Sequence, residues 1–346
     1  MSCAGEPGTG AVRAAGARGS RLRAAVMLAG ATRKSVLGQM SGRSVVDLPL
    51  TPDESILDYW HLELVDLAMA RGLDELAVRV MIDRGGLKPT LRVSEPPVSM
   101  RLEEDPGDYR GTGGLLSDVA RDYDDDDELL VINGSVVPAD RLVALVDRLD
   151  ATEADVAILT TASGEPLGVT RVRCGALRGI KAVGFVDLKE QALPQIAAEF
   201  DVRVARVDLG GQVAVRTLAS YVEAVRGFTR RVRRGARLDP DAAFDEDWRA
   251  TFGLVESGAQ VADTAVIHDA VILRGATVGA GATVVRSVVA GGATVPAGAL
   301  VVDRVVGASG RRRADVELGG RRPSVSAGVA RARGKNGAAG SGEGGR

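Results

Sequence analysis

The sequence has few aromatic residues, few cysteines and little net charge. Aromatic residues make up 3% of the 346 residues and hydrophobic residues 45%, which predicts a core built from Val, Leu, Ile and Ala. The net charge of −2 provides no overall field for nucleic acid or a membrane surface, so we expect neither as a partner. Of the two cysteines, Cys3 lies in a Gly- and Arg-rich leader and Cys174 far along the chain. We therefore expect no structural disulfide and a reducing, cytoplasmic location.

Long hydrophobic runs are also missing. No apolar stretch reaches the roughly 18 residues that a membrane span requires, so none is expected. Residues 1–21 lack the apolar segment of a signal peptide, and we interpret them as a disordered leader. Residues 308–346 form a basic Gly/Arg-rich tail, which we also expect to be disordered; an electrostatic tether to an acidic partner is the alternative.

The middle of the chain alternates between strand and helix patterns. The predicted strands are Ala24–Leu28, Leu76–Ile82, Leu129–Asn133, Val156–Thr160 and Val202–Val207, and the predicted helices are Asp53–Arg71, Asp140–Leu149, Leu188–Phe200 and Ala219–Phe228. The segment Thr51–Glu54 supplies a start signal for the first helix. This alternation predicts an α/β fold over residues 22–228, Rossmann-like, with a mostly parallel sheet covered on both faces. Ligands of such sheets bind at the carboxyl ends of the strands.

The pattern changes after residue 228. Residues 229–258 are charged and rich in turn residues, and we interpret them as a linker. Over residues 259–307, branched aliphatic residues recur about every six positions with small residues between them: Val266, Ile272, Val278, Val284, Val289, Val295 and Val301. This repeat predicts a short left-handed parallel β-helix. Because so short a coil has little core of its own, we expect its open end to be covered by another subunit, in a homo-oligomer or with a related chain.

The loop after the first strand has part of a phosphate-binding pattern. In VMLAGATRKSVLG, residues 26–38, the strand breaks at Gly30 and is followed by Arg33 and Lys34. Phosphate-binding turns use several glycines so that backbone N–H groups can approach the phosphate. Only one glycine is present at this turn, so the loop has the position of such a turn but only part of its chemistry.

Four segments, in this order, resemble the sugar-1-phosphate nucleotidyltransferases, a family that includes mannose-1-phosphate guanylyltransferases, glucose-1-phosphate adenylyltransferases and other NDP-sugar pyrophosphorylases. They are RGTGGLL at Arg110–Leu116, LLVINGSVV at Leu129–Val137, GFVDLKEQALPQIA at Gly184–Ala197 and VRTLASYVEA at Val215–Ala224. A hexapeptide-repeat β-helix after an α/β domain is similar to the architecture of these enzymes. The resemblance covers roughly residues 22–307 and implies binding of a nucleotide or sugar nucleotide.

The resemblance also implies particular site residues. The implied nucleotide-binding residues are Leu28, Ala29, Gly30, Arg33, Gly111, Thr112, Gly113, Gly114, Asn133 and Gly134. Four catalytic positions depart from the family pattern: Ala31 replaces a loop glycine, Val45 the lysine, and Ser135 and Ala214 the two magnesium-binding aspartates. Mg²⁺ needs hard oxygen ligands such as carboxylates, so we expect no metal cofactor unless the protein is active through other residues.

Three functions remain open from the sequence. We interpret the chain as a catalytically degenerate nucleotidyltransferase-like protein that binds its nucleotide weakly or acts as a regulatory or scaffold subunit of an active paralogue. The first alternative is an active, divergent sugar-1-phosphate nucleotidyltransferase whose metal is held by acids such as Asp47 or Asp187. The remote alternative is a hexapeptide acyltransferase that uses His268.

Two further features are expected to have structural roles. The acidic stretch Asp122–Leu130 is interpreted as a solvated loop and not as a cation site, since adjacent acids in a loop rarely converge on one ion. His61, within the first predicted helix, is interpreted as a structural residue.

Overall fold

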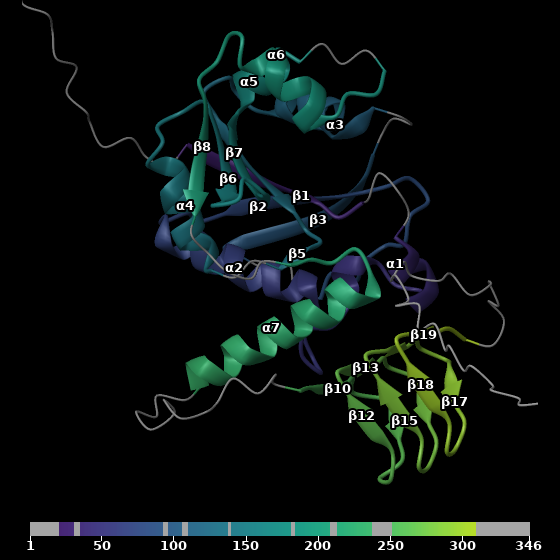
Figure 1. Ribbon diagram of the computed structural model, residues 1–346. Coiled ribbons are helices and arrows are strands. Elements are labelled where there is room, and N and C mark those ends of the chain that lie inside the picture. Colours follow the sequence, from purple (N-terminus) through teal and green to yellow (C-terminus); the bar gives the residue numbers. More distant parts are fainter. Residues whose placement is uncertain are drawn as a thin grey trace, which may run out of the picture. The chain divides into compact units, whose positions relative to one another are not determined.

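The computed structural model describes residues 21–30, 35–92, 96–105, 110–137, 140–180, 184–207, 213–236 and 251–308. The first part of the chain contains one large sheet and one two-stranded antiparallel sheet, and three small parallel sheets follow after residue 251 (Figure 1). The predicted α/β class with a mostly parallel sheet is therefore confirmed.

The large sheet has seven strands in the order β3-β2-β1-β4-β7-β6-β8. The strands are β1 (Leu22–Leu28), β2 (Leu76–Ile82), β3 (Val98–Glu104), β4 (Glu128–Asn133), β6 (Val156–Thr161), β7 (Pro166–Arg173) and β8 (Val202–Val207). Only β7 runs antiparallel to its neighbours, because a short turn joins it to β6. Strands β3 and β7 were not predicted. Both carry polar residues at alternate positions, and this breaks the continuous apolar run that marks a strand buried on both faces.

Helices cover both faces of the sheet. They are α1 (Val36–Ser41), α2 (Ile56–Ala70), α3 (Gly111–Val119), α4 (Leu142–Asp150), α5 (Cys174–Arg178), α6 (Leu193–Ile196) and α7 (Leu218–Ala236), with short turns η1 (Val45–Asp47), η2 (Ala120–Asp122) and η3 (Leu188–Ala192). Helices α2, α4 and α7 contribute to one hydrophobic cluster and α3, α5 and α6 to another. These two groups lie on opposite sides of the sheet in Figure 1.

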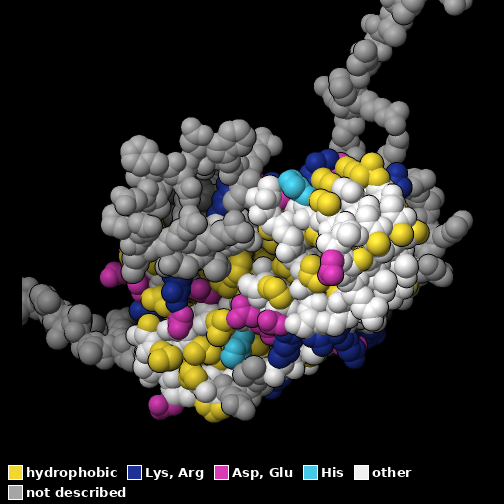
Figure 2. Space-filling model, turned by 90° about the horizontal axis from the view of Figure 1, so that it is seen from below, with side chains coloured by type: hydrophobic (Ala, Val, Ile, Leu, Met, Phe, Trp, Pro, Cys, Tyr) yellow, Lys and Arg dark blue, Asp and Glu magenta, His cyan; other side chains and the backbone are white. Residues whose placement is uncertain are grey.

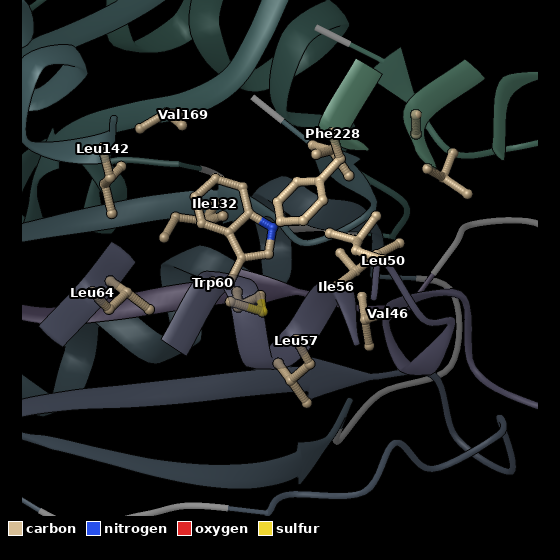
Figure 3. Packing of buried hydrophobic residues seen from close by; sticks show 14 of the residues in the cluster. Val46, Leu50, Ile56, Leu57, Trp60, Leu64, Ile132, Leu142, Val169 and Phe228 are labelled. Atoms are coloured by element: carbon tan, nitrogen blue, oxygen red, sulfur yellow. The ribbon is translucent and has the colours of Figure 1, made fainter. Parts of the chain in front are cut away.

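The larger cluster is packed around Trp60 of α2 (Figure 3). Leu64, Ile132 and Phe228 surround its ring, and each comes from a different element. The Trp60 Nε1–H group donates a hydrogen bond of 3.2 Å to the carbonyl oxygen of Gly134. This bond ties helix α2 to the residues that follow β4, and it satisfies the one polar atom of a fully buried ring.

Helix boundaries differ from the predictions at several ends. Helix α2 begins at Ile56 and not at Asp53, because Ser55 and Asp58 form a capping box there. The predicted helix 188–200 is a π-turn, η3, followed by α6, and it ends at Ile196. Helix α4 covers Leu142–Asp150 instead of Asp140–Leu149. Helix α7 continues to Ala236, so the first residues of the segment interpreted as a linker, 229–258, are helical.

Ten short strands form the three small sheets, here called the three-sheet region (residues 253–306). They are β10 (Gly253–Val255), β11 (Gln260–Val261), β12 (Val266–His268), β13 (Ala270–Ile272), β14 (Thr277–Val278), β15 (Thr283–Val285), β16 (Val288–Val289), β17 (Thr294–Val295), β18 (Leu300–Val302) and β19 (Val305–Val306). Successive strands along the chain belong to successive sheets, so every third strand pairs. The three sheets are β10-β13-β16-β19, β11-β14-β17 and β12-β15-β18, and all are parallel. Strand β10 lies within the segment predicted as a linker.

The repeat has a period of 17 residues, because Leu254, Val271, Val288 and Val305 pair in one continuous ladder. The residues that pack inside are Val255, Val261, Ile267, Ile272, Val278, Val284, Val289, Val295, Val301 and Val306, spaced six, six and five apart. The sequence prediction placed Val266 inside. This is wrong, since Ile267 pairs with Val284 and Val266 is 54% exposed.

The three-sheet region shares a hydrophobic cluster with the large sheet's helices. Leu254, Val271 and Val288 point outward from the β10-β13-β16-β19 sheet and belong to the same cluster as Trp60. Two ion pairs accompany this packing. Arg43 donates to the buried carboxylate of Glu256 at 2.7 Å, and Arg226 donates to that of Asp269 at 2.8 Å. Among the described residues, no helix is long and apolar enough to cross a membrane.

Candidate functional site

The carboxyl ends of β1 and β4 bring together three of the residues implied as nucleotide ligands. The Gly134 N–H group donates to the Leu28 carbonyl oxygen at 3.1 Å, so the two strand ends are held side by side. The side-chain oxygen of Asn133 accepts hydrogen bonds from the N–H group and the hydroxyl of Ser135, at 3.2 and 2.9 Å. Leu28, Asn133 and Gly134 therefore share one edge of the sheet, which is where an α/β sheet binds its ligands.

The turn after β1 is pulled toward the end of β2. The N–H groups of Ala29 and Gly30 both donate to the Met81 carbonyl oxygen, at 2.9 and 3.1 Å. A side chain at Gly30 would place its first carbon 2.4 Å from a carboxylate oxygen of Asp83. Gly30 is thus required for close approach to Asp83, whether or not a phosphate binds there. The remaining predicted loop positions, Ala31 and Arg33, lie outside the described residues.

Asp83 is a residue of this edge that the sequence analysis missed. It directly follows β2, whose predicted limits Leu76–Ile82 agree with the structure. A polar residue immediately after a predicted parallel strand is the signal that indicates it. Its carboxylate lies beside Gly30, at the turn where a phosphate was expected.

The two positions implied as magnesium ligands are neighbours in space. Ala214 pairs with Val136 in the small antiparallel sheet of β5 (Val136–Val137) and β9 (Val213–Ala214). The N–H group of Val215 donates to the Ser135 carbonyl oxygen at 2.8 Å. Ser135 and Ala214 therefore lie together beside the ends of β1 and β4. Neither provides a carboxylate, and the Ser135 hydroxyl already bonds Asn133.

This donor set does not fit Mg²⁺. A magnesium site is built from carboxylate and other oxygens in octahedral geometry, and an alanine and a hydrogen-bonded serine supply no anionic ligand. Over the described residues, no group of three or more His, Cys, Asp or Glu side chains is arranged to hold a metal ion.

The position implied for the catalytic lysine packs against the hydrophobic interior. Val45 opens the turn η1, is half-buried and packs against the larger cluster. A valine there adds to the core and places no cation at the sheet edge. A valine at position 45 fits its surroundings, because its side chain packs against apolar neighbours.

The two acids named as alternative metal ligands are already used by the backbone. Asp47 accepts from the Thr90 N–H group at 3.3 Å, and burial raises the pKa of its carboxyl group. Asp187 caps η3 by accepting from the N–H groups of Lys189 and Glu190, at 2.8 and 3.0 Å. Both contacts are ordinary structural roles for aspartate at turns and helix starts.

The glycines of the segment at 110–116 have a packing role. At Gly111, which has a φ of +69°, an added side-chain carbon would lie 2.4 Å from the Val186 carbonyl oxygen. The Gly113 N–H group donates to that same oxygen at 2.9 Å. The Thr112 hydroxyl accepts from the Leu188 N–H group at 3.0 Å, and Gly114 is buried in α3. The glycine pattern here is explained by the close approach of Val186, so it does not by itself indicate a ligand.

The acidic stretch 122–130 contacts arginines. Arg23 donates to Asp127 at 2.9 Å, and Arg173 and Arg178 pair with Asp126 and Asp125. Among the described residues, no group of three or more His, Cys, Asp or Glu side chains is arranged there to hold a cation. Charged groups of both signs also lie next to one another on the face seen in Figure 2, with basic and acidic side chains in close proximity.

The two histidines stand apart from the sheet edge just described. His61 lies in α2, partly buried, and desolvation lowers its pKa. His268 is about half exposed in β12, with its Nδ1 atom 3.5 Å from the Asp269 carboxylate.

A groove of about 570 Å³ lies near the starts of β2 and β3, away from the strand ends that form the predicted site. Its polar lining includes Glu75, Ser99, Arg101 and Asp122. The Glu75 carboxylate accepts from the Ser99 hydroxyl at 3.1 Å, and Asp122 is bonded to Arg79 at 2.5 Å. These groups satisfy one another and leave no concentrated charge of one sign for a ligand.

Comparisons with known proteins name no family for this chain. No family pattern matches the sequence, and no curated protein matches it. Among solved structures, the chain is similar to the crystal structure of HddC from Yersinia pseudotuberculosis, with 11% identical residues and a TM-score of 0.43. That match covers 60% of this chain and 100% of HddC. A likeness of this size assigns neither a family nor an activity.

Proposed function

We propose that this chain is a catalytically degenerate relative of the sugar-1-phosphate nucleotidyltransferases. On this proposal it binds a nucleotide or sugar nucleotide weakly at the carboxyl ends of β1 and β4, or acts as a regulatory or scaffold subunit beside an active paralogue. The three-sheet region is, in the same proposal, a short left-handed β-helix.

The observation that carries the proposal is the adjacency of Ser135 and Ala214. Sequence resemblance alone equated these positions with two magnesium-binding aspartates, although 79 positions separate them along the chain. The pairing of β5 with β9 sets Ala214 opposite Val136, the residue after Ser135, so the two positions are backbone neighbours. Two positions that are backbone neighbours beside the ends of β1 and β4, and that carry no carboxylate, support loss of the metal rather than a misplaced alignment.

The energetic consequence of that loss is large. Metal stabilisation of a transferring phosphoryl group contributes several kcal/mol. Because each 1.4 kcal/mol or so corresponds to a factor of about ten, its loss lowers the rate by several powers of ten. The core position of Val45 removes a cation as well.

Binding without turnover remains compatible with the retained parts. Gly30 and Asn133–Gly134 stand at the strand ends where an α/β sheet binds its ligands, although the Gly30 and Gly134 N–H groups are already bonded within the chain.

The alternative is an active, divergent nucleotidyltransferase. It requires a metal held by other acids, and the two named candidates, Asp47 and Asp187, bond backbone N–H groups instead. No observation on the described residues favours acyl transfer through His268.

The test restores the missing carboxylates. The double variant Ser135→Asp with Ala214→Asp should bind Mg²⁺ or Mn²⁺ more tightly than the wild type, measured by calorimetry or Mn²⁺ paramagnetic resonance. Ser163→Asp, an exposed change in the β6–β7 turn, is the matched control and should not bind the ion. Turnover of sugar 1-phosphate and nucleoside triphosphate should stay near zero in all three proteins, since the loop and lysine are not restored.

Two results would contradict the proposal. If the double variant gains no metal affinity while remaining folded, positions 135 and 214 are not the former ligand pair. If the wild type releases pyrophosphate readily with Mg²⁺ and Arg33→Ala abolishes this, the site has been rebuilt from other residues and the alternative holds.

A further inference from the structure

The groove near the starts of β2 and β3 lies on one face of the large sheet. Val98 and Met100 of β3 pack into the larger hydrophobic cluster, so Ser99 and Arg101 point to the opposite face. Ala77 of β2 pairs with Ser99 and packs against the second cluster, that of α3, α5 and α6, which places it on that same face. This part of the face is the floor of the groove, whose volume is about 570 Å³.

Two charged side chains of opposite sign line the groove. The exposed Glu75 carboxylate accepts from the Ser99 hydroxyl at 3.1 Å, and this neutral partner leaves the charge of Glu75 uncompensated. The Arg101 side chain is 63% exposed and contacts Glu103 through its Nε atom at 2.5 Å. A guanidinium has five N–H donors, so four more can bind an anion. The groove therefore offers one group for a cation and one for an anion.

The other acids of the groove are held by an internal cation. Glu103 and Asp122 both bind the buried Arg79, at 2.7 and 2.5 Å. The charges in and around the groove thus nearly cancel, with no excess that would attract an anion or a cation alone. A ligand that carries one charge of each sign matches this arrangement.

The spacing of the two groups limits the chemistry of the ligand. Glu75 bonds Ser99, and Arg101 is the next residue of β3 on the same face, about 7 Å further along the strand. A ligand that bonds both side chains must therefore carry its ammonium and its carboxylate close together. An α-amino acid does so, because both groups are attached to one carbon.

The apolar lining indicates the side chain of that ligand. Ala77 and the half-buried Tyr123 both line the groove and pack against the margin of the second cluster. An aromatic ring beside an open apolar floor favours contact with an apolar side chain. We propose that this groove binds an α-amino acid with an apolar side chain. Its carboxylate bonds Arg101, its ammonium bonds Glu75, and its side chain packs on Ala77 and Tyr123.

The exposure of both charged groups sets the strength of binding. Ion pairs that remain in contact with water contribute little, so we expect a dissociation constant of about 1–10 mM. The groove is at the amino ends of β2 and β3, whereas the proposed nucleotide site is at the carboxyl ends of β1 and β4. This inference therefore does not depend on the proposed function.

Saturation-transfer NMR of the full chain with L-leucine tests the proposal. The methyl protons of the ligand should receive the strongest transfer, and the titration should give a dissociation constant in the stated range. N-acetyl-L-leucine lacks the positive charge and L-leucinamide the negative one. Each should bind at least threefold more weakly than L-leucine, because each loses one of the two ion pairs.

Single substitutions locate the site. Glu75→Gln and Arg101→Gln should each weaken L-leucine binding at least threefold. Arg203→Gln is the matched control, since Arg203 is 64% exposed on a sheet edge strand and pairs with an acid two residues away, as Arg101 does. It should bind L-leucine as the wild type does. Circular dichroism should show the same fold for all of these proteins.

Four results would overturn the proposal. The first is no transfer to L-leucine up to about 30 mM. The second is an analogue lacking one charge that binds as tightly as L-leucine. The third is either groove variant, Glu75→Gln or Arg101→Gln, binding as the wild type does. The fourth is an equal loss of binding in Arg203→Gln, which would show an effect of overall charge and not of the groove.

Discussion

Replacing Gly111 by alanine should destabilise the protein far more than the same change at Gly72. Both glycines have positive φ, +69° and +61°, a conformation that costs an alanine about 1–2 kcal/mol. They differ in their surroundings. An alanine carbon at 111 would lie 2.4 Å from the Val186 carbonyl oxygen, whereas nothing lies within 4 Å at 72.

The difference between the two variants isolates the contact with Val186. Relieving the overlap requires movement of backbone, since the Val186 carbonyl and carbon atoms are the nearest groups. Overpacking of this kind costs about 1–3 kcal/mol. We therefore expect Gly111→Ala to lower the free energy of unfolding by about 2–5 kcal/mol and Gly72→Ala by about 1–2 kcal/mol.

Urea unfolding followed by circular dichroism measures both values. The midpoint should fall more for Gly111→Ala, with similar slopes in the two variants. Equal losses in the two variants would refute the packing explanation. If Gly111→Ala were as stable as Gly72→Ala but lost nucleotide binding, the glycine would be explained by a ligand instead.

Three further predictions concern buried groups. Arg43→Ala should lower the unfolding free energy by about 3 kcal/mol, since it removes the counter-charge of the buried Glu256 carboxylate and leaves it only the Arg274 backbone N–H group. A loss below about 1 kcal/mol in denaturant unfolding would contradict this. Trp60→Phe should lower the free energy of unfolding by about 2–3 kcal/mol in the same assay, because the Gly134 carbonyl loses its hydrogen-bond donor and the smaller ring leaves a cavity. An unchanged midpoint would argue against that hydrogen bond. Burial raises the pKa of the Cys174 thiol from 9.0 to about 12, so the folded protein holds this proton more tightly than the unfolded chain. The contribution of this thiol to stability is complete below pH 9 and is lost as the pH rises toward 12. Labelling of the Cys174 thiol at pH 9, in a Cys3→Ser background, should be slow until denaturant is added. Fast labelling of the folded protein would contradict the burial.

Buried strands were predictable because hydrophobic burial leaves a local pattern. The buried strand β2 has its predicted limits, since an apolar run marks it, and the mostly exposed edge strand β8 has them as well, since its apolar residues alternate. The start of α2 was missed by three residues, because Thr51 and Ser55 are both capable of capping and only the reciprocal bond from Asp58 selects Ser55.

The period of the three-sheet region shows a different limit. Seven aliphatic residues suggested a six-residue step with one irregularity, and Val266 was counted as inward. The structure has a five-residue step in every turn, at corners where Asp269, Arg286 and Asp303 adopt φ of 50°, 45° and 54°. Non-glycine residues in this conformation are uncommon, so composition gives little sign of the shorter corner.

The candidate site was predictable in position but less so in chemistry. The strand pattern placed Asn133 and Gly134 at a strand end. The pairing of Val136 with Ala214, which brings Ser135 near, depends on a two-residue sheet too short to leave a pattern. Gly111 shows the converse, since the sequence cannot distinguish a glycine that faces a ligand from one that faces Val186.

The most direct test of the central claim is pyrophosphate release by the purified wild-type chain. Sugar 1-phosphates and each nucleoside triphosphate would be supplied with and without Mg²⁺, alongside the Ser135→Asp/Ala214→Asp variant. The account predicts no release above background in the wild type under either condition. Mg²⁺-dependent release by the wild type, at a rate typical of enzymes, would contradict it.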